Sequence, residues 1–135
     1  MTRFFKTVPR CAATLPAMAE TKHEGSCHCG AVKFEVTANI EGLAECNCSI
    51  CSRAGWKLAF VPETAFTLKS GQDALQDYQF GKHHTHHLFC KTCGVRSFSW
   101  GTDKEGAKTY AVNARCLENF DHAALPIQQF DGASL

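Results

Sequence analysis

Long hydrophobic segments and an excess of charge of either sign are both missing from this sequence. No run of about 18 apolar residues occurs, so no segment is long enough to cross a bilayer as a helix. The 14 lysines and arginines nearly balance the 13 aspartates and glutamates, and the formal net charge is +1. A surface without a basic surplus gives no electrostatic reason to bind nucleic acid or a membrane. We therefore expect neither as a partner.

Internal repeats and strong helix signals are missing as well. The chain instead contains short segments in which apolar residues alternate with polar ones or form brief runs, bounded by glycine and proline. Such segments are typical of β-strands. Helical turns are expected only after Cys48 and at 117–120. We predict a small, mainly β, antiparallel domain with short helical turns, whose strands cover residues 31–36, 57–62, 66–69, 75–80, 95–100 and 108–113.

The N-terminal segment, residues 1–22, differs from the rest. Its first ten residues are basic and contain no acid, and its apolar stretch is too short for a secretory signal. We interpret it as a disordered tail or as an over-called leader in front of a true start at Met18; an organelle transit segment is a further interpretation. The domain then spans 23–135, and Cys11 lies outside its metal chemistry.

Cysteine is abundant, with nine residues in 135. A secreted chain would use them as disulfides, and a cytosolic one would keep them as thiolates for metal or redox work. Seven of them lie two or three positions from another cysteine, a spacing that suits a shared ion better than a bridge. The odd total also argues against complete pairing. We therefore predict thiolate metal ligands and a cytoplasmic protein.

Zinc is the metal that such a ligand set favours, because it prefers four soft ligands in a tetrahedron. Two pairs about sixty residues apart would join the start of the domain to its later strands. Each pair is followed directly by glycine, which permits a tight turn around the ion. We predict a closed structural zinc site in this four-cysteine group, which consists of Cys27, Cys29, Cys90 and Cys93.

The remaining cluster, Cys46, Cys48 and Cys51, lies within six residues and can wrap one ion from a single loop. We name it the three-cysteine group. Three thiolates leave the fourth zinc position open and give a local charge of about −1, which makes the ion a poor acid toward water. A substrate thiol is a better fourth ligand. The alternative is a closed site in which Cys116 or a histidine is the fourth ligand.

Four segments together resemble a known family, the glutathione-dependent formaldehyde-activating family, which also includes centromere protein V. The resemblance covers about residues 22–130 and contains all the cysteine clusters in order. The matching segments are GSCHCGAVKF at 25–34, CNCSICSR at 46–53, FCKTCGV at 89–95 and VNARCL at 112–117.

The resemblance implies a β-rich fold with two zinc ions per chain, one structural in the four-cysteine group and one catalytic in the three-cysteine group. It also implies a carbon–sulfur lyase-type activity, the reversible joining of glutathione and formaldehyde to S-hydroxymethylglutathione. A small thiol is then the partner. Arg53 and Arg115 are the candidates for binding its carboxylates in bidentate fashion.

Other residues are assigned more simply. The histidines of the run at 83–87 are expected on a solvated strand or loop rather than in a third metal site, because alternate side chains of a strand point to opposite faces. Trp56 and Trp100 are expected in the core or in the wall of the site. Cys116 is the spare thiol expected nearest the three-cysteine group.

Two further functions compete with an enzyme. A binding or scaffold module would use both zinc ions structurally, and its mark would be a fourth protein ligand at the second ion. A thiol-based zinc or redox sensor is the third possibility. The missing ligand of the three-cysteine group favours the enzyme.

Overall fold

The structure, a computed structural model, describes residues 20–134, and the predicted N-terminal segment therefore lies, up to residue 19, outside the described residues. The mainly β fold expected from the sequence is confirmed. One short helix, α1 (Ser49–Ala54), accompanies ten strands. The strands are β1 (Thr21–Ser26), β2 (Lys33–Ala38), β3 (Leu43–Cys46), β4 (Leu58–Pro62), β5 (Phe66–Ser70), β6 (Leu75–Tyr78), β7 (Thr85–Cys90), β8 (Phe98–Thr102), β9 (Lys108–Asn113) and β10 (Ile127–Phe130).

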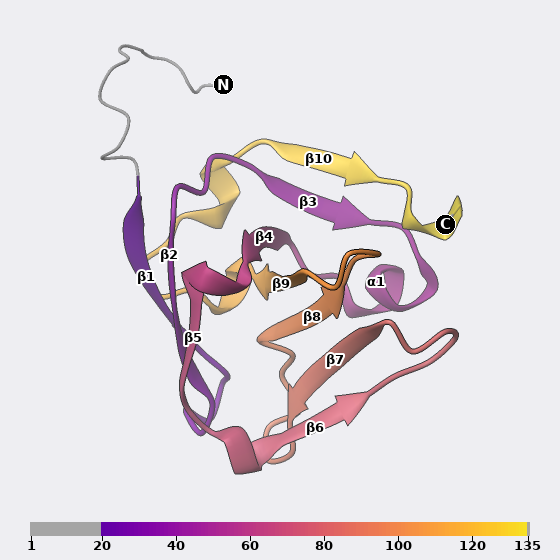
Figure 1. The fold of residues 1–135 in the computed structure, drawn as a ribbon. Helices are drawn as coiled ribbons and strands as arrows, with labels where there is room; N and C mark the ends of the chain where they lie inside the picture. Colours follow the sequence, from indigo (N-terminus) through magenta and orange to yellow (C-terminus); the bar gives the residue numbers. More distant parts are fainter. Residues whose placement is uncertain (1–19, 135) are drawn as a thin grey trace.

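The strands form two sheets. A three-stranded sheet has the order β1-β2-β5, and a seven-stranded sheet has the order β10-β3-β4-β9-β8-β7-β6. All neighbouring pairs are antiparallel except β10 and β3, which run parallel. In Figure 1 the three-stranded sheet lies on the left, and α1 lies on the opposite side, between β3 and β7. The helix therefore sits far from the smaller sheet.

The core lies where the two sheets meet. In β2 the alternation of apolar residues buries Phe34 and Val36 almost completely. The Phe34 ring stacks on Phe66 of β5 with ring centroids 5.5 Å apart, and Phe66 packs on Phe98 of β8 at 4.6 Å. Large aromatic side chains of both sheets thus interlock, and burial of their apolar area stabilises the fold.

Some element boundaries differ from the sequence prediction. β8 is shifted toward the C-terminus, β1, β3 and β10 were not predicted, and β7 lies where the sequence predicted either a strand or a loop. The helical turn expected at 117–120 lies earlier, as a 3-10 turn at Ala114–Cys116. The reason is local: the Asn113 side chain accepts a hydrogen bond from the backbone N–H of Arg115 and caps the turn there. Leu117 instead forms a β-bridge with Gly25.

None of the helices in the described part of the chain is both long and apolar enough to cross a membrane.

Candidate metal centres and the cavity beside them

The four-cysteine group is assembled from both sheets. Cys27 directly follows β1 of the smaller sheet, and Cys90 ends β7 of the larger one. Cys29 and Cys93 lie in the turns that follow. The four sulfur atoms lie within 4.8 Å of one another. The Cys29 sulfur is 3.6 Å from both the Cys27 and the Cys90 sulfur.

Backbone amides surround these sulfurs. The N–H of Val32 donates to Cys27 Sγ at 3.3 Å, and the N–H of Thr92 donates to Cys90 Sγ at 3.4 Å. The N–H groups of Cys29 and Val95 lower the pKa of the Cys93 thiol to about 6. Amide donors favour the thiolate, the form that binds metal. Four thiols that converge among amides fit a tetrahedral soft cation.

The three-cysteine group is built from one turn of chain. Cys46 ends β3, Cys48 is the N-cap residue of α1, and Cys51 lies inside this helix. Residues three apart share a helix face, which brings Cys48 and Cys51 together. All three sulfur atoms lie within 4.8 Å of one another. α1 ends at Ala54, and Gly55 caps it. The left-handed backbone of Gly55 lets its N–H donate a hydrogen bond to the Cys51 carbonyl.

Ionisation of these thiols is unequal. Burial raises the pKa of Cys51 to about 12. Burial also opposes ionisation of Cys48, but hydrogen bonds from the Cys51 backbone N–H, from the Cys51 and Cys46 thiols and from the Ile50 N–H outweigh it and lower the pKa of the Cys48 thiol. Three sulfurs held this close cannot all carry a negative charge without a neighbouring cation. The donor set therefore fits a bound metal ion better than three free thiolates.

The C-terminal segment, residues 128–134, covers one side of the three-cysteine group. Gly132 lies so close that a Cβ atom there would overlap Cys46 Sγ and would lie 3.4 Å from Cys48 Cβ. Asn47 holds the segment in place. Its Nδ2 donates to Asp131 Oδ1 at 3.0 Å, and its Oδ1 accepts from the N–H of Ala133 at 2.9 Å.

A cavity of about 390 Å³, which we name the thiol cavity, opens beside the three-cysteine group. Three aromatic residues that are unusually exposed line it: Phe60, Phe80 and Phe130 are 54%, 41% and 45% exposed. Large apolar side chains rarely gather at a surface without a function. The further lining residues are Cys46, Cys48, Ile50, Cys51, Trp56, Leu58, Gly81, Lys82, His84, Thr85, His87, Ser99, Ala111 and Gly132.

Two buried side chains of the thiol cavity carry polar atoms without partners. Trp56 and His87 are only 4% and 6% exposed. Within residues 20–134, neither Trp56 Nε1 nor His87 Nδ1 meets a hydrogen-bond partner. Burial, with the Arg96 guanidinium beside it, lowers the pKa of His87 below its ordinary value of 6.5. The wall of the thiol cavity thus contains a neutral imidazole and a buried indole N–H.

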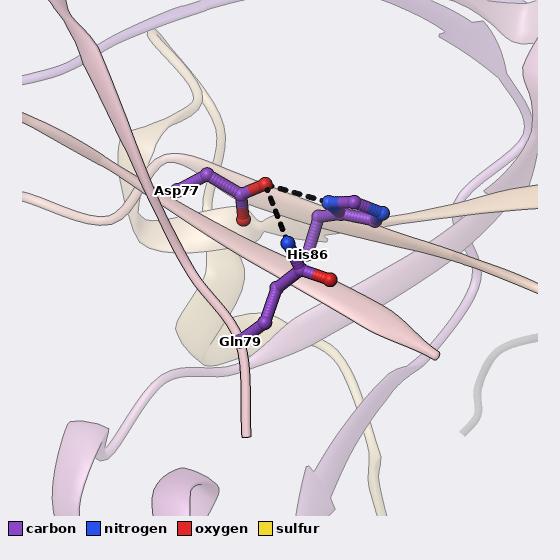
Figure 2. Close-up of polar contacts among 3 residues, drawn as sticks. All are labelled: Asp77, Gln79 and His86. Atoms are coloured by element: carbon purple, nitrogen blue, oxygen red, sulfur yellow. Dashed lines mark hydrogen bonds and ion pairs between the residues drawn. The ribbon is translucent and has the colours of Figure 1, made fainter. Parts of the chain in front are cut away.

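The other histidines of the run do not form a third metal cluster in the described structure. His86 lies next to His87 on β7, and its side chain points to the opposite face. There its Nδ1 is 2.6 Å from Asp77 Oδ2, an oxygen that also accepts from Gln79, as Figure 2 shows. Its ring stacks on Trp100 at 3.9 Å. Trp100 therefore lies away from the thiol cavity, whereas Trp56 forms part of its wall.

The arginines predicted to bind substrate lie apart. Arg53 is exposed on α1, where its Nη1 donates to the Ser49 carbonyl at 2.8 Å. It lines a second cavity that borders the thiol cavity. Arg115 lies in the 3-10 turn Ala114–Cys116 and lines neither cavity.

Cys116 is not near the three-cysteine group, contrary to the sequence expectation. Its Sγ lies 3.9 Å from the Arg96 carbonyl. Burial raises the pKa of Cys116, and the neighbouring Cys27 and Cys93 thiols add to this effect. The spare thiol therefore lies beside the four-cysteine group. Cys116 ends the 3-10 turn Ala114–Cys116 and lies against the segment before β8.

Sequence reasoning missed several residues of the thiol cavity. His87 was treated as solvated, although the strand alternation that exposes His86 places His87 on the other face. The aromatic residues Phe60, Phe80 and Phe130 come from three different segments, and Gly132 comes from the C-terminal segment. Only their register in the sheet brings them together, so no local motif could have indicated them.

Comparisons with known proteins match most of the described chain. A family model described as glutathione-dependent formaldehyde-activating enzyme matches residues 22–131. A Rhodobacter sphaeroides protein known from its crystal structure is 30% identical, with a TM-score of 0.66. That match covers 78% of this chain and 99% of the other.

Proposed function

We propose, because the chain belongs to the glutathione-dependent formaldehyde-activating enzyme family, that it joins a small thiol and formaldehyde reversibly into an S-hydroxymethyl adduct. With glutathione the product is S-hydroxymethylglutathione, and the activity is of the carbon–sulfur lyase type. The single observation that carries this proposal is the position of the three-cysteine group at the wall of an apolar cavity.

The proposed cofactor is zinc, two ions per chain. The four-cysteine group would hold one ion in a closed structural site, and Cys46, Cys48 and Cys51 would hold the other. A zinc ion bound to the three-cysteine group would supply Lewis acidity, which favours the thiolate form of a substrate thiol. Among the described residues, no histidine, cysteine or acid joins the three-cysteine group as a fourth ligand, so a substrate sulfur has room to approach.

The cavity walls support the chemistry. In the forward reaction the sulfur attacks the carbonyl carbon, a C–S bond forms, the C=O π pair moves to oxygen, and the proton lost by the thiol ends on that oxygen. The aromatic walls limit water around the reacting atoms, which strengthens electrostatic interactions there. His87 is neutral, lines the same cavity, and would donate a hydrogen bond to the developing oxygen. Holding both reactants in one cavity supplies proximity.

Replacement of Cys48 by serine tests this function. We expect C48S to bind one metal ion in place of two, to lose adduct formation from glutathione and formaldehyde, and to keep the wild-type circular dichroism spectrum. Cys116→Ser is the matched control, because it removes a thiol outside both groups. In cobalt-substituted wild type, glutathione should change the visible spectrum. Turnover by C48S, or an unchanged cobalt spectrum, would contradict the proposal.

A substrate contact by Arg115 stays a prediction from the sequence. Its position outside the thiol cavity gives it no further support.

A further inference from the structure

We propose that the cavity next to the thiol cavity is an anion subsite in which Arg53 and Arg96 bind a carboxylate of the thiol substrate. We name it the arginine cavity. The inference rests on the proposed function, because it identifies the substrate of the same site as an acidic thiol. It adds a residue, Arg96, that neither the family match nor the sequence motifs assign.

The two cavities are neighbours. The arginine cavity has a volume of about 550 Å³ and is lined by Ser49, Ile50, Arg53, Ala54, Tyr78, Phe80 and Arg96. Ile50 and Phe80 also line the thiol cavity. A flexible molecule can therefore place its sulfur at the three-cysteine group and extend past these two side chains toward the arginines.

The charges of the arginine cavity are unbalanced. Two guanidinium groups line it, and no carboxylate does. Neither arginine forms an ion pair with any acid in the described structure. Because like charges that share a cavity raise each other's energy, an anion bound between them relieves this cost. The arrangement suits a small acid rather than a neutral group.

Arg96 is held ready for a ligand. Its guanidinium carbon lies 5.6 Å from the Phe89 ring centroid and 6.0 Å from the Trp56 ring centroid, so aromatic side chains fix its plane. Its Nη1 is buried and has no hydrogen-bond partner within residues 20–134. A buried donor without a partner is costly, and a carboxylate in the arginine cavity would offer the Arg96 guanidinium an acceptor that the chain itself does not provide.

Arg53 offers the second set of donors. One of its nitrogens bonds to the Ser49 carbonyl, which anchors the side chain along α1. A guanidinium carries five N–H donors in a planar fork, so others stay available for a carboxylate. Because α1 also carries Cys51, the helix links the position of the anion to that of the sulfur.

Equilibrium binding to the zinc-loaded protein tests the subsite. Glutathione and its diethyl ester share the same sulfur, and only the free acid presents carboxylates. Calorimetry should give the wild type a preference for the acid. In Arg53→Gln and in Arg96→Gln we expect the Kd for glutathione to rise roughly tenfold to a hundredfold, as loss of a charge-assisted hydrogen bond implies, with the Kd for the diester unchanged.

Lys104→Gln is the control, because it removes one exposed positive charge outside both cavities. It should leave both Kd values unchanged. Equal binding of acid and ester by the wild type would overturn the subsite, as would equal weakening of both ligands in the arginine variants. A loss carried by Arg115→Gln in place of the two cavity arginines would overturn it too. Preferred binding of the acid without turnover would refute the proposed function and leave the subsite supported.

Discussion

At Gly132 the C-terminal segment lies directly against the three-cysteine group. A methyl group at this position would occupy the space of the Cys46 sulfur. We therefore expect Gly132→Ala to displace the segment or the sulfur and to lower the affinity of the second metal ion at least tenfold, about 1.4 kcal/mol. Metal content after dialysis against a weak chelator would fall from two ions per chain toward one.

The matched control for this substitution is Gly42→Ala. A Cβ atom there would lie 3.6 Å from the Pro126 carbonyl oxygen, which is an ordinary contact. It should keep both ions. If Gly132→Ala keeps both ions with unchanged affinity, the close approach of the C-terminal segment has no role in the site.

His87 gives a prediction about acid stability. Burial lowers its folded pKa below the unfolded value of 6.5, so the unfolded chain binds the proton more readily. The contribution of neutral His87 to stability is present above pH 6.5 and is lost as the pH falls below it. Besides burial, the Arg96 charge disfavours the proton; Asp77 favours it less strongly than Arg96 opposes it, and His86 opposes it weakly. The free energy of unfolding should therefore fall less steeply in His87→Gln than in wild type between pH 7 and pH 5.

The measurement is urea unfolding of both proteins at several pH values. Parallel stability curves across this range would show that His87 titrates normally in the folded protein. His84→Gln is a suitable control, because His84 lines the same cavity but is exposed.

At the scale of residues, the metal-ligand candidates were visible in the sequence because their spacing is local. Cys46, Cys48 and Cys51 need only one turn of chain to converge. Arg96 and His87 were not visible, since strand pairing and not proximity in sequence places them near the site. Arg53 was predicted from the sequence, but with Arg115 as its expected partner. No spacing rule connects a residue of α1 with the segment before β8, where Arg96 lies.

At the scale of elements, β10 and β3 form the one parallel pair among the strands of residues 20–134, and this pair joins the C-terminal segment to β3. Asn47 extends this pairing beyond the strand ends through its bonds to Asp131 and Ala133. We expect Asn47→Ala to cost about 1–2 kcal/mol and to loosen the segment locally. Amide hydrogen exchange should show faster exchange at 128–134, with the core strands unchanged.

Asn39→Ala is the matched control for the Asn47 substitution. Asn39 is the same residue type, and its side chain makes only a local bond to Glu41. Exchange at the C-terminal segment should be unaffected. Equal rates in Asn47→Ala and wild type would show that β10 alone holds the segment.

The strands that sequence analysis located are those with clear alternation, such as β2 and β9. β1 was not predicted because its sequence, TKHEGS, is polar at most positions. The segment forms a strand because it pairs with β2. β10 was not predicted because it is a four-residue edge strand whose partner, β3, lies far away in the sequence. Pairing of β10 with so distant a partner leaves no periodic signal in this short strand.

At the scale of the whole molecule, the four-cysteine group joins the two sheets. One pair follows β1 of the smaller sheet, and the other follows β7 of the larger sheet. A metal ion there would cross-link the two sheets, and its binding energy would appear as folding energy. The three-cysteine group draws on β3 and α1 alone.

We therefore expect Cys93→Ser to lower Tm by on the order of 10 °C or more and Cys48→Ser to lower it by a few degrees at most. Differential scanning fluorimetry of both variants, with Cys116→Ser as control, provides the comparison. A larger loss of Tm in Cys48→Ser than in Cys93→Ser would reverse the assignment of the structural centre.

The different chain spans of the two groups have a consequence for synthesis on the ribosome. All three thiols of the Cys46–Cys51 loop emerge almost together, so this loop can capture an ion while most of the chain is still unmade. The four-cysteine group cannot be complete until Cys93 has emerged. Gly132, which lies against the three-cysteine group, emerges later still. Cys27 and Cys29 emerge earlier, but they must wait for Cys90 and Cys93, so metal loading of the three-cysteine group can precede that of the four-cysteine group.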